Sequence, residues 1–570
     1  MQQRVGLETP AAGHRVRAWL LALGIGCTLL GCAKKGSEMQ FASDIEGRRA
    51  QFMRQELHAN LEHLTVGDRS AVDHLISAAR IMDDIFWRQA WAGSPDFAKH
   101  VADLSGPGGR AAQDYYRIMF GPWDRLRSRQ PFIGNLPHPP GAGFYPEDMT
   151  KEEFEAWITA HPEDKASFES PTTVIRREGT RLVAVPYSSE YGDLLRRAAS
   201  SLRTAAQVAS TPSLKTFLES RAAAFLSDDY LQSDMDWMDL DGNLEIVIGP
   251  YETYEDELFG YKASFEALLC VVDPLDSENL GKFKAELPWL EANLPIPDKH
   301  KNPNRGAESP IRVVDEIYTA GDARAGVPTI AFNLPNDERV RETKGSKKVL
   351  LKNMMRAKYD AILVPIAERA IPSDRMSDVD FDTYYHFVLF HELCHGLGPG
   401  RIVVDGRETE VRLELKDLYA TLEEAKADVM GAWALHLLAD KGLMEASIAS
   451  QLPWTFVPGL LRSARFGITE AHALGVICQF TYLMEKGALV QTPEGRLAPV
   501  PALWFQSITE LTHDLTMLQA LGDYDAAKAW VDKYGQVPAG MQKILDSLAD
   551  IPVDVDPIYT AVPQQLSQRR

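Results

Sequence analysis

The amino-acid sequence predicts a mostly helical protein of the α+β class, with one β-rich region between two helical regions. Apolar residues recur at spacings of three and four in residues 51–230 and again in residues 337–548, as expected for amphipathic helices. Residues 231–336 instead carry short apolar runs that are partly β-branched, which is typical of strands. The hydrophobic content of 45% is ordinary for a globular protein, and 570 residues suffice for more than one lobe.

Residues 1–31 have the layout of a secretory signal. Arg15 and Arg17 precede an apolar run of about 14 residues, which is too short to cross a bilayer. The run ends in LLGC at Cys32, which resembles a bacterial lipobox, so we expect cleavage before Cys32, acylation of its thiol and a polar tether over residues 32–50. Ala, not Asp, follows Cys32, which favours a lipid anchor in the outer membrane facing the periplasm. The alternatives are an ordinary signal peptide or an apolar anchor.

Charge and cysteine content argue against a nucleic-acid-binding protein and against a disulfide-rich protein. The net charge of −20 argues against a nucleic-acid partner, because phosphate backbones require a basic surface. Cys270, Cys394 and Cys478 are too few for a disulfide framework, so we expect them to be buried free thiols.

The β-rich region and its flanks can be divided further. Residues 131–146 are rich in Pro and Gly and predict a long loop within the first helical region. LEIVIGPYETY and SFEALLCVVD predict two strands joined by EDELFGYK, and IRVVDEIYTAG and PTIAFNLPN predict further β structure. Residues 549–570 follow the second helical region and are expected to form a C-terminal tail.

The segment FHELCHGLGPG contains the spacing of a metal site. The preceding residues are apolar enough for a buried helix, which ends at GLGPG because Gly and Pro cannot continue it. His391 and His395 would lie one turn apart on one face, and neutral imidazoles at that spacing can hold a zinc ion. Glu392 could then accept a proton from a water molecule that the metal activates.

A third ligand is expected on a later helix. DLYATLEEAKADVMGAWALHLLADKG has a helical pattern that carries Glu423, Glu424 and Asp428. Acidic groups among apolar residues need a partner when they are buried, and a metal with its histidines would provide one. The alternative is a solvated acidic helix face.

These two motifs, in this order, resemble the dipeptidyl peptidase III family. Three more segments resemble that family in the right order: residues 251–273, 333–353 and 470–487. The resemblance implies a two-lobed fold, in which a helical zinc lobe faces a lobe with a β-barrel across a wide cleft. It also implies a zinc metallopeptidase that hydrolyses short peptides and releases N-terminal dipeptides.

The resemblance also implies roles for single residues. One zinc ion would be held by His391, His395 and Glu424, with Glu392 as the general base. Glu423 and Asp428 would orient the histidines. The remaining residues would act on the substrate: Tyr254 and His472 on the developing oxyanion, and Glu252 and Asn353 on the peptide.

Two features depart from the family pattern. The motif HELCH has five residues where much of the family has six, H-E-x-x-G-H, which leaves metal binding intact. Lys348 stands where we expect an asparagine near the amino end of the substrate, and its charge would repel an α-ammonium group.

Other functions stay open at this point. A non-hydrolytic envelope lipoprotein could bind peptides with the same fold, although such a protein needs no general base at Glu392. A zinc hydrolase of another substrate class is also possible. GRETEVRLELKDLYATLEE looks like a Nudix box, but R-E-x-x-E-E-x-G is absent. The expected partners are short peptides and a membrane, and the sequence does not predict the oligomeric state.

Overall fold

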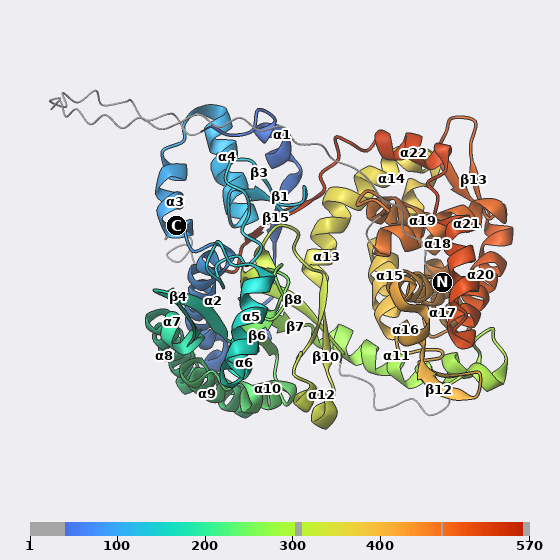
Figure 1. Cartoon of the computed structure of the whole chain (residues 1–570). Helices are drawn as coiled ribbons and strands as arrows, with labels where there is room; N and C mark the ends of the chain where they lie inside the picture. The colour runs from blue at the N-terminus through green and yellow to red at the C-terminus, as the bar shows by residue number, and fades with distance from the viewer. Residues whose placement is uncertain (1–39, 303–310, 469–470, 563–570) are drawn as a thin grey trace, which may run out of the picture. The chain divides into compact units, whose positions relative to one another are not determined.

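The computed structural model describes residues 40–302, 311–468 and 471–562 (Figure 1). The signal peptide, Cys32 and residues 32–39 of the tether lie outside the described residues, so the lipid anchor and the envelope location stay predictions. Within the described part of the chain, no helix combines the length and hydropathy needed to cross a bilayer. The described residues form a single compact unit, so the three predicted regions are parts of one body.

The β-rich region forms a five-stranded sheet. Its strands, in spatial order, are β6 (Leu244–Glu252), β7 (Ser264–Val272), β8 (Ile311–Gly321), β10 (Lys347–Leu351) and β9 (Ala331–Leu334). Only the β8–β10 pair is parallel. Every residue of β7 is buried, because α2 (Val66–Ala90) covers β7 and β8. Helices α8 (Gly192–Val208) and α9 (Pro212–Ser227) pack behind α2.

The sheet differs from prediction in two ways. The expected β-barrel is an open sheet in the described residues, with β6 and β9 at its edges. Strand β10 lies inside the region predicted to be helical. Its apolar run is too short for a stable helix, and its hydrogen-bond partners come from β8 and β9.

The second helical region is built around α17 (Tyr419–Asp440). Residues on all sides of α17 are buried, because it packs against several other helices (Figure 1). These helices are α15 (Phe381–Cys394), α18 (Ala446–Ala464), α19 (Ala471–Glu485) and α20 (Pro501–Leu521). The helices predicted around HELCH and around EEAKAD are therefore confirmed as α15 and α17.

The remaining elements are short or lie at the periphery. The helices are α1 (Ile45–Ala50), α3 (Ser94–Ala102), α4 (Gly106–Met119), α5 (Lys151–Ala160), α6 (Lys165–Glu169), α7 (Tyr187–Glu190), α10 (Leu231–Met238), α11 (Pro274–Ala292), α12 (Glu338–Lys344), α13 (Lys352–Lys358), α14 (Val364–Ala370), α16 (Val411–Leu415), α21 (Tyr524–Tyr534) and α22 (Ala539–Asp546). The strands are β1 (Phe52–Leu57), β2 (Trp123–Asp124), β3 (Gln130–Pro131), β4 (Thr173–Glu178), β5 (Arg181–Pro186), β11 (Arg401–Val404), β12 (Arg407–Glu410), β13 (Leu489–Gln491), β14 (Leu497–Pro499) and β15 (Asp554–Tyr559).

Several of these elements lie in regions where the sequence predicted something else. Helix α1 occupies the end of the predicted tether, the β4–β5 hairpin lies in the first helical region, and α11 lies in the β-rich region. The predicted C-terminal tail contains β15, which pairs in parallel with β1 near the other end of the chain. Such pairing depends on a partner about 500 residues away, which local periodicity cannot reveal. The prediction of three buried free thiols is confirmed.

A buried ion pair attaches β15 to the body of the protein. Lys358 Nζ lies 2.9 Å from Asp554 Oδ1, and both side chains are almost completely buried. Lys358 Nζ also donates a hydrogen bond to the Pro328 carbonyl. Removal of one partner would leave the other as an uncompensated buried charge.

We therefore expect Asp554→Asn to lower the free energy of unfolding by about 3–5 kcal/mol. Asp550→Asn is the matched control, because Asp550 forms an exposed ion pair with Arg369 in the same segment. Such surface pairs contribute about 0–1 kcal/mol. Urea unfolding of both variants measures the difference, and equal losses would contradict the assigned role of Asp554.

Candidate metal centre and active site

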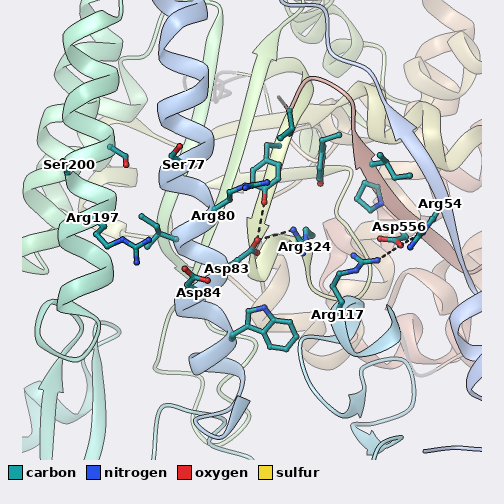
Figure 2. Close-up of a pocket in the computed structure, with 18 residues that line it drawn as sticks. Arg54, Ser77, Arg80, Asp83, Asp84, Arg117, Arg197, Ser200, Arg324 and Asp556 are labelled. Atoms are coloured by element: carbon teal, nitrogen blue, oxygen red, sulfur yellow. Dashed lines mark hydrogen bonds and ion pairs between the residues drawn. The ribbon is translucent and has the colours of Figure 1, made fainter. Parts of the chain in front are cut away.

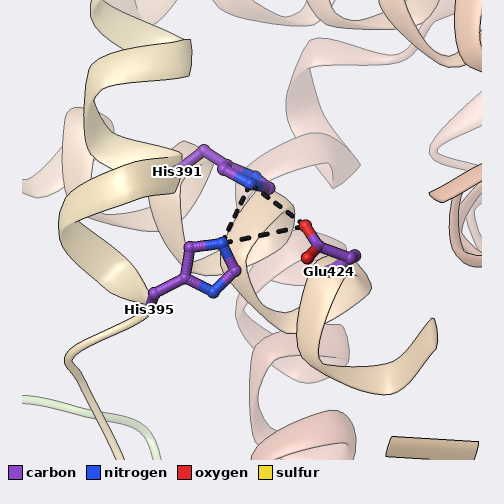
Figure 3. Close-up of side chains that lie close together, drawn as sticks. All are labelled: His391, His395 and Glu424. Carbon is purple, nitrogen blue, oxygen red and sulfur yellow. Dashed lines mark hydrogen bonds and ion pairs between the residues drawn. The ribbon is translucent and has the colours of Figure 1, made fainter. Parts of the chain in front are cut away.

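Helices α15 and α17 bring three potential metal ligands together. His391 Nε2 lies 3.2 Å from His395 Nε2 and 3.3 Å from Glu424 Oε2, and His395 Nε2 lies 3.7 Å from the same oxygen (Figure 3). The two helices approach closely because Gly431 of α17 has no side chain. A Cβ at this position would lie 3.0 Å from the backbone nitrogen of His391.

The other ring nitrogen of each histidine contacts a carboxylate of α17. His391 Nδ1 lies 2.8 Å from Asp428 Oδ1, and His395 Nδ1 lies 2.8 Å from Glu423 Oε1. A carboxylate can only accept, so each Nδ1 carries the proton in the neutral ring and each Nε2 presents its lone pair to Glu424. Glu423 and Asp428 therefore occupy the positions that the sequence predicts for residues that orient the histidines.

Two glutamines and a lysine complete this arrangement, and sequence reasoning missed all three. Gln479 of α19 donates to Asp428 Oδ2 and Gln519 of α20 donates to Glu423 Oε2, each over 2.9 Å. Both glutamines are fully buried. Lys426 Nζ lies 2.8 Å from Glu423 Oε1. Only Lys426 had a signal in the sequence, since it follows Glu423 by three residues on one helix.

The geometry of the cluster fits a bound metal ion. Ligand atoms at about 2.1 Å from a tetrahedral zinc ion lie about 3.4 Å apart, which is close to the three separations found here. Two imidazole lone pairs and a carboxylate oxygen would repel one another without a cation between them. Glu424 Oε2 is also buried, and a third imidazole nitrogen, His472 Nε2, lies 3.0 Å from it.

The charges around the cluster fit a divalent cation. Four carboxylates lie in or beside it, and only two of them are paired with an ammonium group, Lys426 with Glu423 and Lys348 with Glu392. When both histidines are neutral, as metal ligation requires, two negative charges remain. Burial lowers the pKa of His391, but its hydrogen bonds to Asp428 and Glu424 outweigh burial and raise that pKa to about 10. The site thus stabilises positive charge.

Lys348 from the sheet contacts the predicted general base. Its Nζ lies 3.1 Å from Glu392 Oε2 and donates to the Glu392 carbonyl over 2.9 Å. Burial raises the pKa of Glu392, but the charges of Lys348, His391 and His395 lower it below its ordinary value. Glu392 is therefore ionised at neutral pH. The ammonium group that was expected to face the amino end of the substrate is instead engaged with Glu392.

His472 lies beside the cluster on α19. Its Nε2 is 3.0 Å from Glu424 Oε2, and about half of its side chain is exposed. This position leaves one face of the imidazole accessible next to the three potential ligands.

Tyr254 and Glu252 lie together at the end of β6 in the sheet lobe. Tyr254 is 78% exposed and interacts with Glu252, which accepts a hydrogen bond from Asn336. Among the described residues, no hydrogen bond or ion pair connects these two side chains to the histidine cluster. The adjacent Glu255 is buried between Arg125 and Arg129, at 2.7 and 3.0 Å, which fixes the chain next to Tyr254.

Asn353 is not brought to the cluster by any contact in the described structure. Its Oδ1 accepts a hydrogen bond from the Glu316 backbone nitrogen, and its Nδ2 donates to the Glu316 carbonyl, both over 2.9 Å. Nδ2 also donates to the His58 carbonyl. The amide therefore connects α13 to β8 and to the residue after β1.

A cavity of 830 Å³ borders His395. Four of the residues that line it carry exposed or half-buried cationic side chains, Lys299, Lys301, Arg401 and Arg412. This cavity provides space for a small molecule next to the cluster, and its lining contains more cationic than anionic side chains.

Comparison with known proteins places the chain in a family. Residues 147–431, half of the chain, match the family described as Peptidase family M49. The solved structure of DPP III from Caldithrix abyssi has a TM-score of 0.88 and 47% identity, covering 90% of this chain and 99% of that one. Dipeptidyl-peptidase III from Corallococcus sp. strain EGB has a TM-score of 0.76 and 41% identity, covering 93% and 99%.

Two further relatives are similar in sequence, and only one of them is named as a peptidase. Nudix hydrolase 3 of Arabidopsis thaliana is 37% identical over 559 residues, which cover 88% of this chain and 72% of that protein. Dipeptidyl peptidase 3 of Dictyostelium discoideum is 25% identical over 279 residues, which cover 46% and 37%. In this chain, the acidic run that looks like a Nudix box ends at Glu423 and Glu424, and both contact the histidines.

The family match, the two structural matches and the two-lobed helical and sheet architecture agree with one another. The chain therefore belongs to peptidase family M49, the dipeptidyl peptidase III family, and is a metallopeptidase that hydrolyses peptides.

Proposed function

We propose that this protein binds one zinc ion per chain and releases dipeptides from the N-termini of short peptides. The observation that carries the proposal is the convergence of two imidazole nitrogens and one carboxylate oxygen, at tetrahedral ligand separations, in a site with two uncompensated negative charges. A His₂Glu set is typical of catalytic zinc.

His391, His395 and Glu424 would hold the zinc ion. When bound there, zinc would supply a Lewis acid for the peptide carbonyl and would lower the pKa of a coordinated water to about 7. The protein fixes the orientation of the two histidine ligands, because Asp428 and Glu423 each accept a hydrogen bond from the Nδ1 of one ring.

Glu392 would accept a proton from the attacking water and donate it to the departing amine. The ion pair with Lys348 supports this role, since it keeps the carboxylate ionised and in place. His472 would donate to the developing oxyanion from the helical side, and the exposed Tyr254 hydroxyl would do so from the sheet lobe.

The proposed dipeptide register depends on how the substrate's amino end is bound. Glu252, next to Tyr254, offers a carboxylate to the free α-ammonium group. Lys348 is engaged with Glu392 and so presents no charge that would repel that group. The cationic cavity beside His395 would accommodate the carboxyl-terminal part of the peptide.

The first test incubates the protein with an unbiased pool of short peptides, with mass spectrometry of the products. We expect dipeptides from N-termini, and a fall in kcat of about 10²–10⁴-fold in Glu392→Gln because the general base is removed. Glu257→Gln, which changes an exposed glutamate of the sheet lobe, is the control and should keep its activity. Internal or single-residue cuts would overturn the dipeptide register, and zinc binding without cleavage would indicate a peptide-binding role.

A second test removes a carboxylate that orients one of the proposed metal ligands. Glu423→Gln should weaken zinc binding about 10–100-fold, because His395 loses the charged acceptor at its Nδ1. Competition with a chromophoric chelator measures this affinity. Asp440→Asn on the same helix is the matched control, since Asp440 contacts only the surface residue His436 among the described ion pairs. Unchanged affinity in Glu423→Gln would contradict the proposed site.

A third test separates the two possible roles of Lys348. If the ammonium group holds Glu392, Lys348→Met should lower kcat about tenfold, or about 1.4 kcal/mol, with little change in KM. Lys348→Arg should restore most of the rate because it keeps the charge. If Lys348 instead faces the substrate amine, Lys348→Met would lower KM and leave kcat unchanged.

A further inference from the structure

A second cavity, of 880 Å³, lies in the sheet lobe away from the histidine cluster (Figure 2). It is formed where α2 and α8 meet β8 and the paired terminal strands β1 and β15. None of the residues proposed to bind zinc or peptide line it. Five arginines and three aspartates do, so the wall has an excess of two positive charges in a chain whose net charge is −20.

Two of the three aspartates already form hydrogen bonds or ion pairs with other groups. Asp83 accepts from the Gly321 backbone nitrogen over 2.7 Å and pairs with Arg324 over 3.2 Å (Figure 2). Asp556 pairs with Arg117 over 2.7 Å and lies 3.7 Å from Arg54. These carboxylates therefore cannot neutralise the remaining arginines.

Arg80 and Arg197 differ from the other three arginines of the wall, and the charge of Asp84 offsets part of that of Arg197. Neither forms an ion pair with any residue of the described chain. Arg80 extends from α2 beside the ring of Tyr318, 5.8 Å from its centroid, and its Nε is buried without a hydrogen-bond partner. Arg197 comes from α8 on the other side of Asp84, which is itself largely exposed (Figure 2).

The other groups of the wall suit an anion with an apolar part. Ser77 and Ser200 add hydroxyl donors from α2 and α8. Trp87, which is stacked on Tyr116 with centroids 5.0 Å apart, adds a rigid aromatic surface. Guanidinium groups bind phosphate oxygens in pairs, and small-molecule pockets have volumes of about 300–1,000 Å³.

We propose that this cavity binds a phosphate-bearing small molecule with at least two negative charges, held by Arg80 and Arg197. The ligand class follows from the unpaired guanidinium groups, the hydroxyl donors and the aromatic wall. The proposal does not depend on the peptidase activity, since no residue is shared between the two sites.

Isothermal titration calorimetry of the full protein at constant ionic strength tests this, with inorganic pyrophosphate and ADP as probes. We expect both to bind, ADP at least as tightly as pyrophosphate because Trp87 offers it an aromatic contact. Arg80→Gln and Arg197→Gln should each weaken binding at least tenfold. Neither side chain forms an ion pair in the described structure, so both variants should fold.

Arg88→Gln is the matched control, because Arg88 is an exposed arginine of α2 that does not line the cavity. It should bind both probes as the unmodified protein does. Equal binding to all three variants would place the anion elsewhere, for example at the metal site, and would overturn the proposal. No binding of either probe would overturn it as well. If pyrophosphate binds and ADP does not, the ligand has no apolar part in contact with Trp87, and that part of the proposal would be wrong.

Discussion

The two hydrogen bonds from His391 and His395, at the end of α15, to the carboxylates of α17 are the constraint on which the proposed metal site depends. They hold each ring by Nδ1, so both Nε2 lone pairs are directed at Glu424. A rotation of either ring would break a bond to a carboxylate and remove a ligand. The close contact of the helices at Gly431 allows both bonds to form at 2.8 Å. The packing of the two helices therefore determines the geometry of the ligands.

Burial explains why so many polar groups surround three ligands. Each carboxylate that orients a histidine is itself removed from water and needs further donors. Gln479, Gln519 and Lys426 supply them from three helices. The site is therefore a polar cluster within a largely apolar helix bundle, and its two remaining negative charges match a divalent cation.

In the proposed mechanism, the sheet lobe contributes to the chemistry through β10 and the end of β6. Lys348 reaches Glu392 across the boundary between sheet and helices, while Tyr254 and Glu252 stay together on the sheet side. The substrate would therefore contact residues from both parts of the chain. The strand β10 was missed from the sequence, and with it the contact between Lys348 and Glu392 on which the proposed role of Lys348 rests.

The sequence by itself determined what depends on local spacing. The turn between His391 and His395, the helix that carries Glu423, Glu424 and Asp428, and strand β8 all follow from periodicity within one segment. Only the tertiary structure decided which distant segments meet. The pairing of β1 with β15, the buried glutamines and the arginine-lined cavity each join residues far apart in the chain. Their partners are selected by packing and by the cost of burying an unpaired polar group, which no single segment encodes.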